Sequence, residues 1–224
     1  MEDKRLIKVT GKGSLKVMPD VTCVTITLEG CYKVYEESLR RSSEDTENLK
    51  DIMAGLGFAR KDVKTLSFNV NTRHESYQTK NGNWKERFVG YEFRHVMKVE
   101  FDSDNARLGK VLYALANAEK ITPEFRLSYT VKDKEASKNE LLGKAVEDAK
   151  AKAVVLSKAA GVKLKQIQSI DYSWGEINFE CSPMGESLRN HAVMACKASG
   201  AYDVNVEPDD IEVSDTVTVV WEIG

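Results

Sequence analysis

Five soft metal-ligand side chains lie between residues 175 and 210 of this sequence. They are Cys181, Met184, His191, Met194 and Cys196, and sulfur and imidazole donors of this kind suit copper(I) or zinc. Their spacing is irregular and matches neither a CxxC zinc motif nor a disulfide framework. One hypothesis is therefore a small-molecule or soft-metal (Cu/Zn) binding protein centred on Cys181, Met184, His191 and Cys196.

The same segment supports a second interpretation. Residues 175–210 have weak hydrophobic periodicity, and an irregular connection of this length in a compact domain is usually functional or disordered. Phe179, Met184, Met194 and Tyr202 would give the segment adaptable apolar surface. That surface would suit a partner protein or another copy of this chain.

No catalytic constellation accompanies these residues. His74, His95 and His191 are far apart, and no GxSxG, HExxH or cysteine-centred nucleophile motif surrounds them. His95 has aromatic and aliphatic neighbours, which fits a hydrogen-bonded core histidine better than a ligand or a base. Carboxylate pairs such as Glu36 and Glu37 fall on polar helix faces, whereas acid/base catalysis needs a perturbed pKa in a pocket. We therefore predict no enzymatic activity and no cofactor.

The composition describes an ordinary globular protein. The chain has 224 residues, of which 42% are apolar and 30% charged, with a formal net charge of −2. So small a charge predicts neither a nucleic-acid partner nor an anionic membrane surface, and no apolar run approaches the ~20 residues of a membrane span. Residues 1–13 lack the apolar core of a signal peptide. We expect a cytoplasmic protein with reduced thiols, or a periplasmic one if a leader has been removed.

The stretch Lys134–Gly161 predicts a long helix around which the other elements are arranged. Asp133 can cap its start and Gly161 can end it, and its length would be about 40 Å. Because the predicted buried face is mostly alanine, whatever packs on it must come close. The residues of that face are Ala136, Leu142, Ala145, Ala149, Ala153, Leu156 and Ala160.

The other elements alternate strands with helices. Arg5–Val17 is predicted to be a strand in which Gly11 and Gly13 mark a bulge or a close backbone approach. Further predicted elements are a strand over Val21–Leu28, a helix over Tyr35–Leu56 ended by Gly57, a helix over Ala106–Glu119 capped by Ser103 or Asp104, and strands over Pro123–Lys132, Ile170–Trp174 and Ile211–Ile223. In the strand after Pro123, the odd-numbered residues are predicted to be buried and the even-numbered ones, Ser128 and Thr130 included, to be wet.

A hairpin is predicted from Val63–Val70 and Phe88–Phe101. Asn81-Gly82 between them favours a two-residue type I′ turn, and this turn fixes the register of the two strands. The expected pairs are Val70 with Phe93, Phe68 with His95, and Leu66 with Met97.

The outer part of this hairpin is basic and aromatic. It carries Arg73, His74, Tyr77, Lys80, Trp84, Lys85 and Arg87. Such an arm could stack on single-stranded nucleic acid, remain solvated, or dock on a neighbouring subunit. Glu75 and Glu86 dilute the positive charge, so we predict no nucleic-acid partner and treat Tyr77 and Trp84 as candidate interface residues.

Together these elements have the order ββαββαβαββ. Hairpins with intervening helices predict an α+β fold, a mainly antiparallel sheet with helices, including the long Ala-rich one, packed on one face. No internal repeat or low-complexity linker divides the chain. We therefore expect residues 1–224 to form a single domain, in one or two lobes, with an irregular loop at about 175–210.

Short motifs spread over nearly the whole chain match one known family. They are Val9-Thr10-Gly11-Lys12-Gly13, Pro19-Asp20, Leu56-Gly57, Asp62-Val63, Tyr91, the alanines Ala145, Ala149 and Ala153, Leu156 to Gly161, and Pro208 to Trp221. On these residues the sequence resembles the SIMPL-domain family, whose bacterial members include periplasmic and outer-membrane-associated antigens. The resemblance implies an α+β domain that self-assembles, in some members into ring- or channel-like oligomers, with loose links to stress tolerance and no established reaction.

The resemblance carries over no catalytic residue. Our leading hypothesis is a non-enzymatic homo-oligomer that acts as a scaffold or interaction module. Its expected contact residues are Tyr77 and Trp84 on the hairpin, and Phe179, Met184, Met194 and Tyr202 in the late loop.

Overall fold

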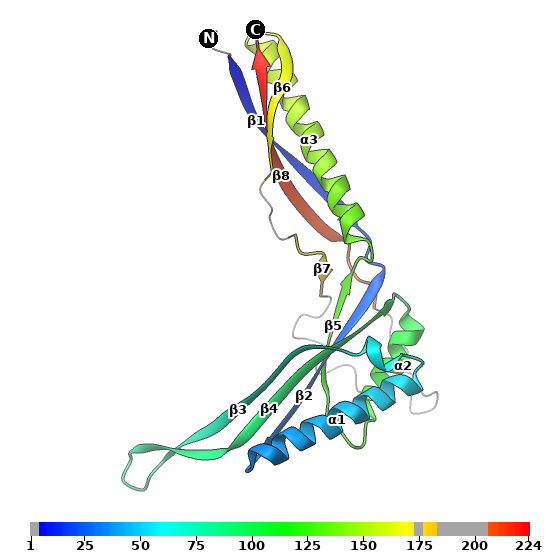
Figure 1. Ribbon diagram of the computed structural model, residues 1–224, viewed down its shortest axis with the longest axis vertical. Helices are drawn as coiled ribbons and strands as arrows, with labels where there is room; N and C mark the ends of the chain where they lie inside the picture. Colours follow the sequence, from blue (N-terminus) through cyan, green and yellow to red (C-terminus); the bar gives the residue numbers. More distant parts are fainter. Residues whose placement is uncertain (1–4, 173–176, 183–205) are drawn as a thin grey trace. The chain divides into compact units, whose positions relative to one another are not determined.

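The computed structural model of the chain describes residues 5–172, 177–182 and 206–224 (Figure 1). Its helices and antiparallel sheets confirm the predicted α+β class. The chain divides into two compact units, which we call unit 1 (Met1–Asp20, Thr130–Cys181 and Asp209–Gly224) and unit 2 (Val21–Tyr129 and Ser182–Pro208). The strands are shared between two sheets, whereas the sequence suggested a single one.

Unit 1 contains a three-stranded antiparallel sheet and one long helix. The strands β1 (Leu6–Val17), β8 (Ile211–Ile223) and β6 (Leu164–Asp171) lie in the order β1-β8-β6. The helix α3 (Lys134–Ala159) runs along β1 and β8 (Figure 1). A two-residue strand, β7 (Glu180–Cys181), precedes the residues left undescribed between 182 and 206.

The helix α3 forms and ends as its sequence predicts. The Asp133 carboxylate accepts a hydrogen bond from the Ala136 amide at 2.8 Å, and Gly161 adopts the left-handed conformation with φ +69°. Its buried row consists of Leu141, Ala145, Ala149, Ala153 and Ser157. Leu156, which was expected on this face, is instead 49% exposed, because the buried row drifts around the helix as it follows the twisted strands.

The alanine row allows the helix to lie almost directly on the β1 backbone. A Cβ atom at Gly11 would lie 2.0 Å from the carbonyl oxygen of Ala145, and one at Gly13 would lie 2.2 Å from that of Leu141. The Lys12 amide between them donates to the Asp148 carboxylate at 2.7 Å. The close backbone approach predicted for the two glycines is therefore confirmed.

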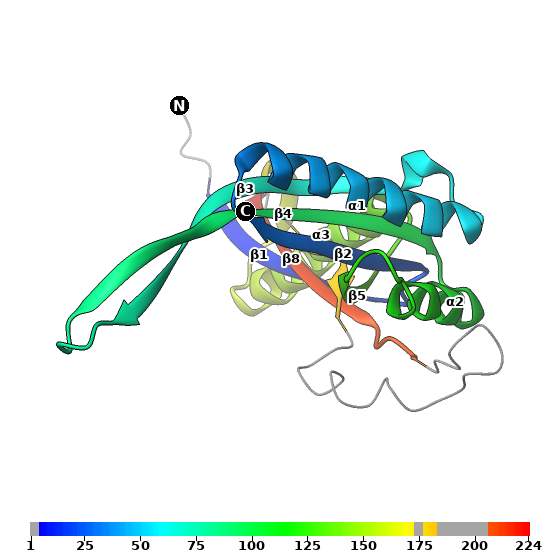
Figure 2. The same cartoon turned by 90° about the horizontal axis from the view of Figure 1, so that it is seen from below.

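Unit 2 is built on a second antiparallel sheet. The unit contains four of the 5 strands of this sheet, β2 (Val21–Tyr32), β3 (Lys64–Gln78), β4 (Trp84–Asp102) and β5 (Glu124–Thr130), in the order β3-β4-β2-β5. The helix α1 (Tyr35–Gly55) packs on β2 and β4 (Figures 1 and 2). A 3₁₀ turn, η1 (Arg60–Asp62), follows α1, and α2 (Asn105–Ala116) follows β4. Asp104 caps α2 by accepting from the Ala106 and Arg107 amides, one of the two caps predicted.

The turn of the β3–β4 hairpin differs from the prediction. The Gly82 amide donates to the Thr79 carbonyl at 2.9 Å, the Thr79 amide donates to the Asn83 carbonyl at 2.8 Å, and Gly82 has φ +81°. These bonds close a three-residue loop that ends in a left-handed glycine, so the two-residue type I′ turn is wrong. The longer loop shifts the pairing of the outer strands by one residue and sets Gln78 opposite Trp84.

Two β-bulges decide the register of the inner hairpin. One bulge lies where Arg73 pairs with Gly90 but His74 pairs with Phe88. It cancels the one-residue shift caused by the loop, so the inner strands return to the predicted register. As a result, the predicted pairs of Val70 with Phe93 and Phe68 with His95 are confirmed. The second bulge, at Leu66, places Thr65 opposite Met97, so the predicted pairing of Leu66 is wrong.

Two predicted strands are also corrected. Ser128 and Thr130 in β5 are buried rather than wet, and the Thr130 hydroxyl donates to the Phe179 carbonyl at 2.6 Å. The strand predicted over Ile170–Trp174 is β6 (Leu164–Asp171) in the structure, and Ile170 is 53% exposed. Trp174, expected in the same strand, lies outside the described residues.

Candidate interaction surface

The outer hairpin presents large side chains to solvent. Beyond Arg73, strands β3 and β4 continue as a two-stranded arm that we call the outer arm (residues 73–90). Trp84 is 70% exposed, Phe88 44% and Tyr77 43%. In unit 2, β3 is an edge strand paired with β4 alone among the described strands. The arm therefore combines exposed rings with an open edge, both of which are features of contact surfaces.

The two interface residues predicted on this arm point in opposite directions. Tyr77 pairs with Lys85, and Gln78 pairs with Trp84. Because neighbouring positions of a strand project to opposite faces, Tyr77 and Trp84 lie on different faces of the arm. The structure does not bring them together.

A row of aromatic rings follows one face of the hairpin. Tyr35 at the start of α1 contacts Tyr91 (ring centroids 5.4 Å apart), Tyr91 contacts Phe88 (5.3 Å), and Phe88 contacts His74 (5.6 Å), each edge to face. Trp84 lies on this face of the arm, four residues beyond Phe88. The interface residues predicted from the sequence did not include Tyr35 and Phe88, which are 49% and 44% exposed, or Tyr91, which is half-buried. Phe88 lies in the outer part of the hairpin, where the pairing differs by one residue from the predicted register.

The two arginines of the arm are ion-paired. Arg73 donates to the Glu92 carboxylate at 2.7 Å, and Arg87 donates to that of Glu75 at 3.0 Å. The hydrogen bond that Arg73 donates to Glu92 raises the pKa of Arg73. These pairs cancel part of the positive charge that made nucleic acid an alternative, and the edge-to-face rings differ from the open ring faces on which bases stack.

His95 is a satisfied core histidine, as its neighbours predicted. The Thr46 hydroxyl donates to the Ser42 carbonyl at 2.7 Å, so it accepts from His95 Nδ1 at 3.0 Å. The other ring nitrogen, Nε2, then accepts from the Thr65 hydroxyl at 2.8 Å. Burial, followed by the charge of Lys50, lowers the pKa of His95. The ring is thus a neutral link between α1 and the β3 edge.

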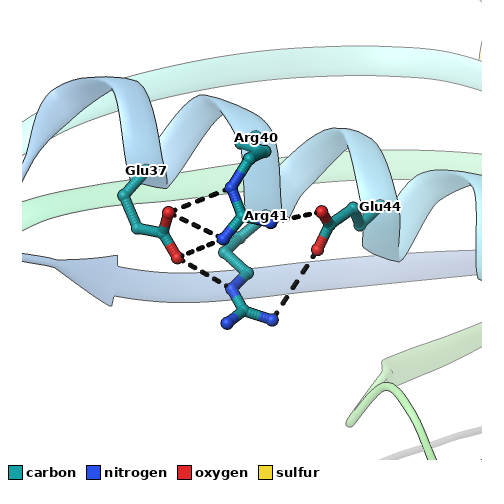
Figure 3. A network of polar contacts seen from close by, with 4 residues as sticks. All are labelled: Glu37, Arg40, Arg41 and Glu44. Atoms are coloured by element: carbon teal, nitrogen blue, oxygen red, sulfur yellow. Dashed lines mark hydrogen bonds and ion pairs between the residues drawn. The ribbon is translucent and has the colours of Figure 1, made fainter.

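A charged network lies on the exposed side of α1 (Figure 3). Glu37 accepts from Arg40 Nε at 3.0 Å and from Arg41 Nε at 2.9 Å, and Glu44 pairs with both arginines. These bonds, above all those from Arg40, lower the pKa of Glu37. An open cavity of about 450 Å³ beside the network is lined by Arg40, Ser43, Glu44, Glu47, Asn48 and Lys120. Its carboxylates, Glu44 and Glu47, are ion-paired with basic side chains, which does not suit a general acid or base.

The structure describes only some of the late-loop residues that were predicted as contact residues or metal ligands. Met184, His191, Met194, Cys196 and Tyr202 lie outside the described residues. Phe179 is only 1% exposed and packs in the core of unit 1 with Leu15, Val131, Leu141, Ile211 and Val213. Its ring therefore supports the fold and offers no contact surface.

Cys181 is the one predicted metal ligand that the structure describes. Its thiol is half-buried and donates to the Asp209 carbonyl at 3.5 Å. Burial and the Asp209 charge raise the pKa of this thiol, which favours the protonated form over the thiolate that binds metal. Within the described ranges, no three His, Cys, Asp or Glu residues gather as a metal site would require.

Comparison with known proteins settles the family. The sequence matches SIMPL, described as a protein of unknown function (DUF541), over residues 7–221. This chain belongs to the SIMPL family. Two relatives of the SIMPL protein are the 26 kDa periplasmic immunogenic proteins of Brucella melitensis biotype 1 and Brucella abortus strain S19. Each is 26% identical over 217 residues, which cover 97% of this chain and 84% of the relative.

The motifs that carry the family resemblance lie at structural contacts of the SIMPL protein. Gly11 and Gly13 meet Ala145 and Leu141, and Ala149 and Ala153 continue the same buried row. Tyr91 belongs to the aromatic row. In the part of the chain that is described, none of the helices has the length and apolar content of a membrane span. The motifs therefore specify the fold of a family whose function is unknown.

Proposed function

We propose that this SIMPL protein is a non-enzymatic, self-assembling scaffold or interaction module, with the outer arm as its assembly surface. The observation that carries the proposal is the aromatic row from Tyr35 through Tyr91 to Phe88, with Trp84 farther along the same face of the arm. Tyr35, Phe88 and Trp84 are 49%, 44% and 70% exposed. A two-stranded arm has little core of its own, so covering these rings would stabilise it. A link to stress tolerance belongs to the same proposal and follows from the family resemblance.

The two faces of the arm allow two contacts. Trp84 and Phe88 project on one face, and Tyr77 projects on the other. One arm can therefore lie between two neighbouring copies, which suits an assembly larger than a dimer. Met184, Met194 and Tyr202 remain part of the proposed contact surface.

The relatives also bear on location. Both are named as periplasmic proteins, which favours the exported alternative over the cytoplasm expected from the sequence. We propose a periplasmic location for this chain. Detection of the native protein in the periplasmic fraction of its host would test this, and recovery with the cytoplasmic fraction would contradict it.

Shortening the arm tests the assembly. Replacing Tyr77–Lys85 by Asn-Gly leaves Ser76 opposite Glu86 across a two-residue turn and removes both candidate rings. We expect the oligomer mass from light scattering to fall while the circular dichroism spectrum keeps its helical content. Lys80→Ser, in the same loop, is the matched control and should keep the wild-type mass. An unchanged mass after shortening would remove the arm from the assembly.

The alternative of a soft-metal or small-molecule site at Cys181, Met184, His191 and Cys196 has its own test. Metal analysis of the purified protein after incubation with copper(I) or zinc should find less than one equivalent bound. Stoichiometric metal that is lost in the Cys181→Ala, Cys196→Ala double variant would support the alternative instead.

A further inference from the structure

A second exposed apolar area lies in unit 1, along the edge strand β6. Ile167 pairs with Trp221 and Ile170 with Val219, and both partners are buried against the alanines of α3. Cross-strand partners share a face, so Ile167 and Ile170 project from the helix-bearing face of the sheet. They are nevertheless 49% and 53% exposed, because α3 covers β1 and β8 and reaches β6 only weakly.

The side of α3 next to β6 continues this apolar area. Leu142 and Val146 pack at the edge of the core together with Leu164 and Tyr172. Val154, two turns further along the same side of the helix, is 48% exposed. We call Val154, Ile167 and Ile170 the β6 strip. It borders a strand that pairs with β8 alone among the described strands, so its other edge keeps unpaired N–H and C=O groups.

We propose that the β6 edge pairs antiparallel with β6 of a second copy of this chain. The pairing would bury the two β6 strips against each other and join two three-stranded sheets into one of six strands. This contact uses unit 1, whereas the outer arm belongs to unit 2. It rests on the proposed function in one respect, namely that the protein self-assembles.

The charges of β6 favour a second copy of the same strand. Lys165 lies near the start of β6, where it pairs with the Glu222 carboxylate of β8 at 3.3 Å, and Asp171 is the last residue of the strand. An antiparallel pair centred on Gln168 and Ser169 sets Ile167 of each copy opposite Ile170 of the other and Gln166 opposite Asp171. Lys165 of each copy then lies one position from Asp171 of the other, which places opposite charges near each other at both ends of the pair. A parallel pair would set like charges side by side. The antiparallel contact is self-complementary, as a two-fold interface requires.

The test combines two changes that act on different units. Ile167→Lys with Ile170→Lys places charges on the β6 strip, and both positions are exposed enough to accept lysine in the folded monomer. The matched control is Val155→Lys, which replaces a 66% exposed valine of α3 outside the strip. Each change is made in the full chain and in the arm-shortened chain, and the mass is measured by light scattering.

We expect the arm-shortened chain to remain a dimer through β6. Adding the two lysines should halve its mass to that of a monomer, whereas Val155→Lys should leave the dimer intact. If shortening the arm alone yields a monomer, the β6 contact is overturned and the arm proposal stands. If shortening the arm leaves the mass unchanged but the two lysines lower the mass of the full chain, the arm proposal fails and the β6 contact stands.

The same variants test whether the strip is covered within one chain. If another segment of the same chain covers β6, the two lysines would lower the unfolding midpoint well below that of Val155→Lys without changing the mass. That result would overturn the contact between copies.

Discussion

The β1–α3 contact of unit 1 and the outer arm of unit 2 use strands in opposite ways. At the β1–α3 contact the strand carries glycine, which has no side chain. Gly11 lies so close to Ala145 and Ala149 that a Cβ atom has no room. On the arm, large rings such as Trp84 and Phe88 stand in solvent. Two of the family motifs, Val9–Gly13 and the alanines of α3, fall at the first contact. These motifs therefore specify packing between backbones, whereas the arm carries side chains that packing within the described part of its unit does not require.

The largest expected effect is at the glycine contact. Gly11→Ala would place its Cβ atom 2.0 Å from the Ala145 carbonyl oxygen and 2.4 Å from the Ala149 amide nitrogen. Both are backbone atoms, so only a displacement of α3 can make room. We expect the free energy of unfolding to fall by about 3 kcal/mol, as measured by denaturant titration with circular dichroism.

The matched control lies in the same helix but away from the contact. Gly143 is within α3, and a Cβ atom there meets nothing within 4 Å. Gly143→Ala should therefore raise the free energy of unfolding by about 0.5 to 1 kcal/mol, since alanine is the better helix former. Similar values for the two variants would contradict the proposed backbone contact.

This contrast also explains how much of the fold the sequence could predict. The close contact between β1 and α3 could be predicted, because the alanines recur at helical spacing and because glycine and alanine both permit a close approach of backbones. The Asp133 and Asp104 caps are local, so sequence spacing is sufficient to find them. The α+β class depends on such local features, and it is confirmed.

The hairpin shows where local reasoning ends. The predicted pairing of Val70 with Phe93 is correct because the bulge at Arg73 offsets the extra residue of the loop. The sequence near Arg73 contains no signal for this bulge. The extra residue of the loop shifts the pairing of the outer strands and thereby places Tyr77 and Trp84 on opposite faces of the arm. Ile170 likewise has a buried-strand pattern, but its exposure depends on how far α3 extends across the sheet.

A smaller effect is expected at His95, which lies at the inner end of the hairpin. Its pKa is lowered in the folded protein by burial and by Lys50, so the unfolded chain binds the proton more tightly. Its contribution to stability is therefore complete above the unfolded-state pKa of about 6.5 and declines as the pH falls below that value. We expect the free energy of unfolding to decrease from pH 8 to pH 5.

The histidine variants isolate this contribution. His95→Gln keeps hydrogen-bonding groups near Thr46 and Thr65 but cannot take up the proton, so the decrease between pH 8 and pH 5 should be smaller than in the wild type. His74→Gln, on the exposed arm, should keep the wild-type decrease. A His95→Gln protein with the full wild-type pH dependence would show that other groups cause it.

The smallest effect on stability is expected at Trp84, the most exposed ring of the outer arm and thus the opposite case to Gly11. The ring is 70% exposed, so Trp84→Ala should change the free energy of unfolding of the monomer by less than about 0.5 kcal/mol. If the arm is an assembly surface, the same substitution should lower the oligomer mass measured by light scattering at low protein concentration. A loss of stability close to that of Gly11→Ala would instead place Trp84 in the fold, because only a ring buried within one chain could contribute so much to folding.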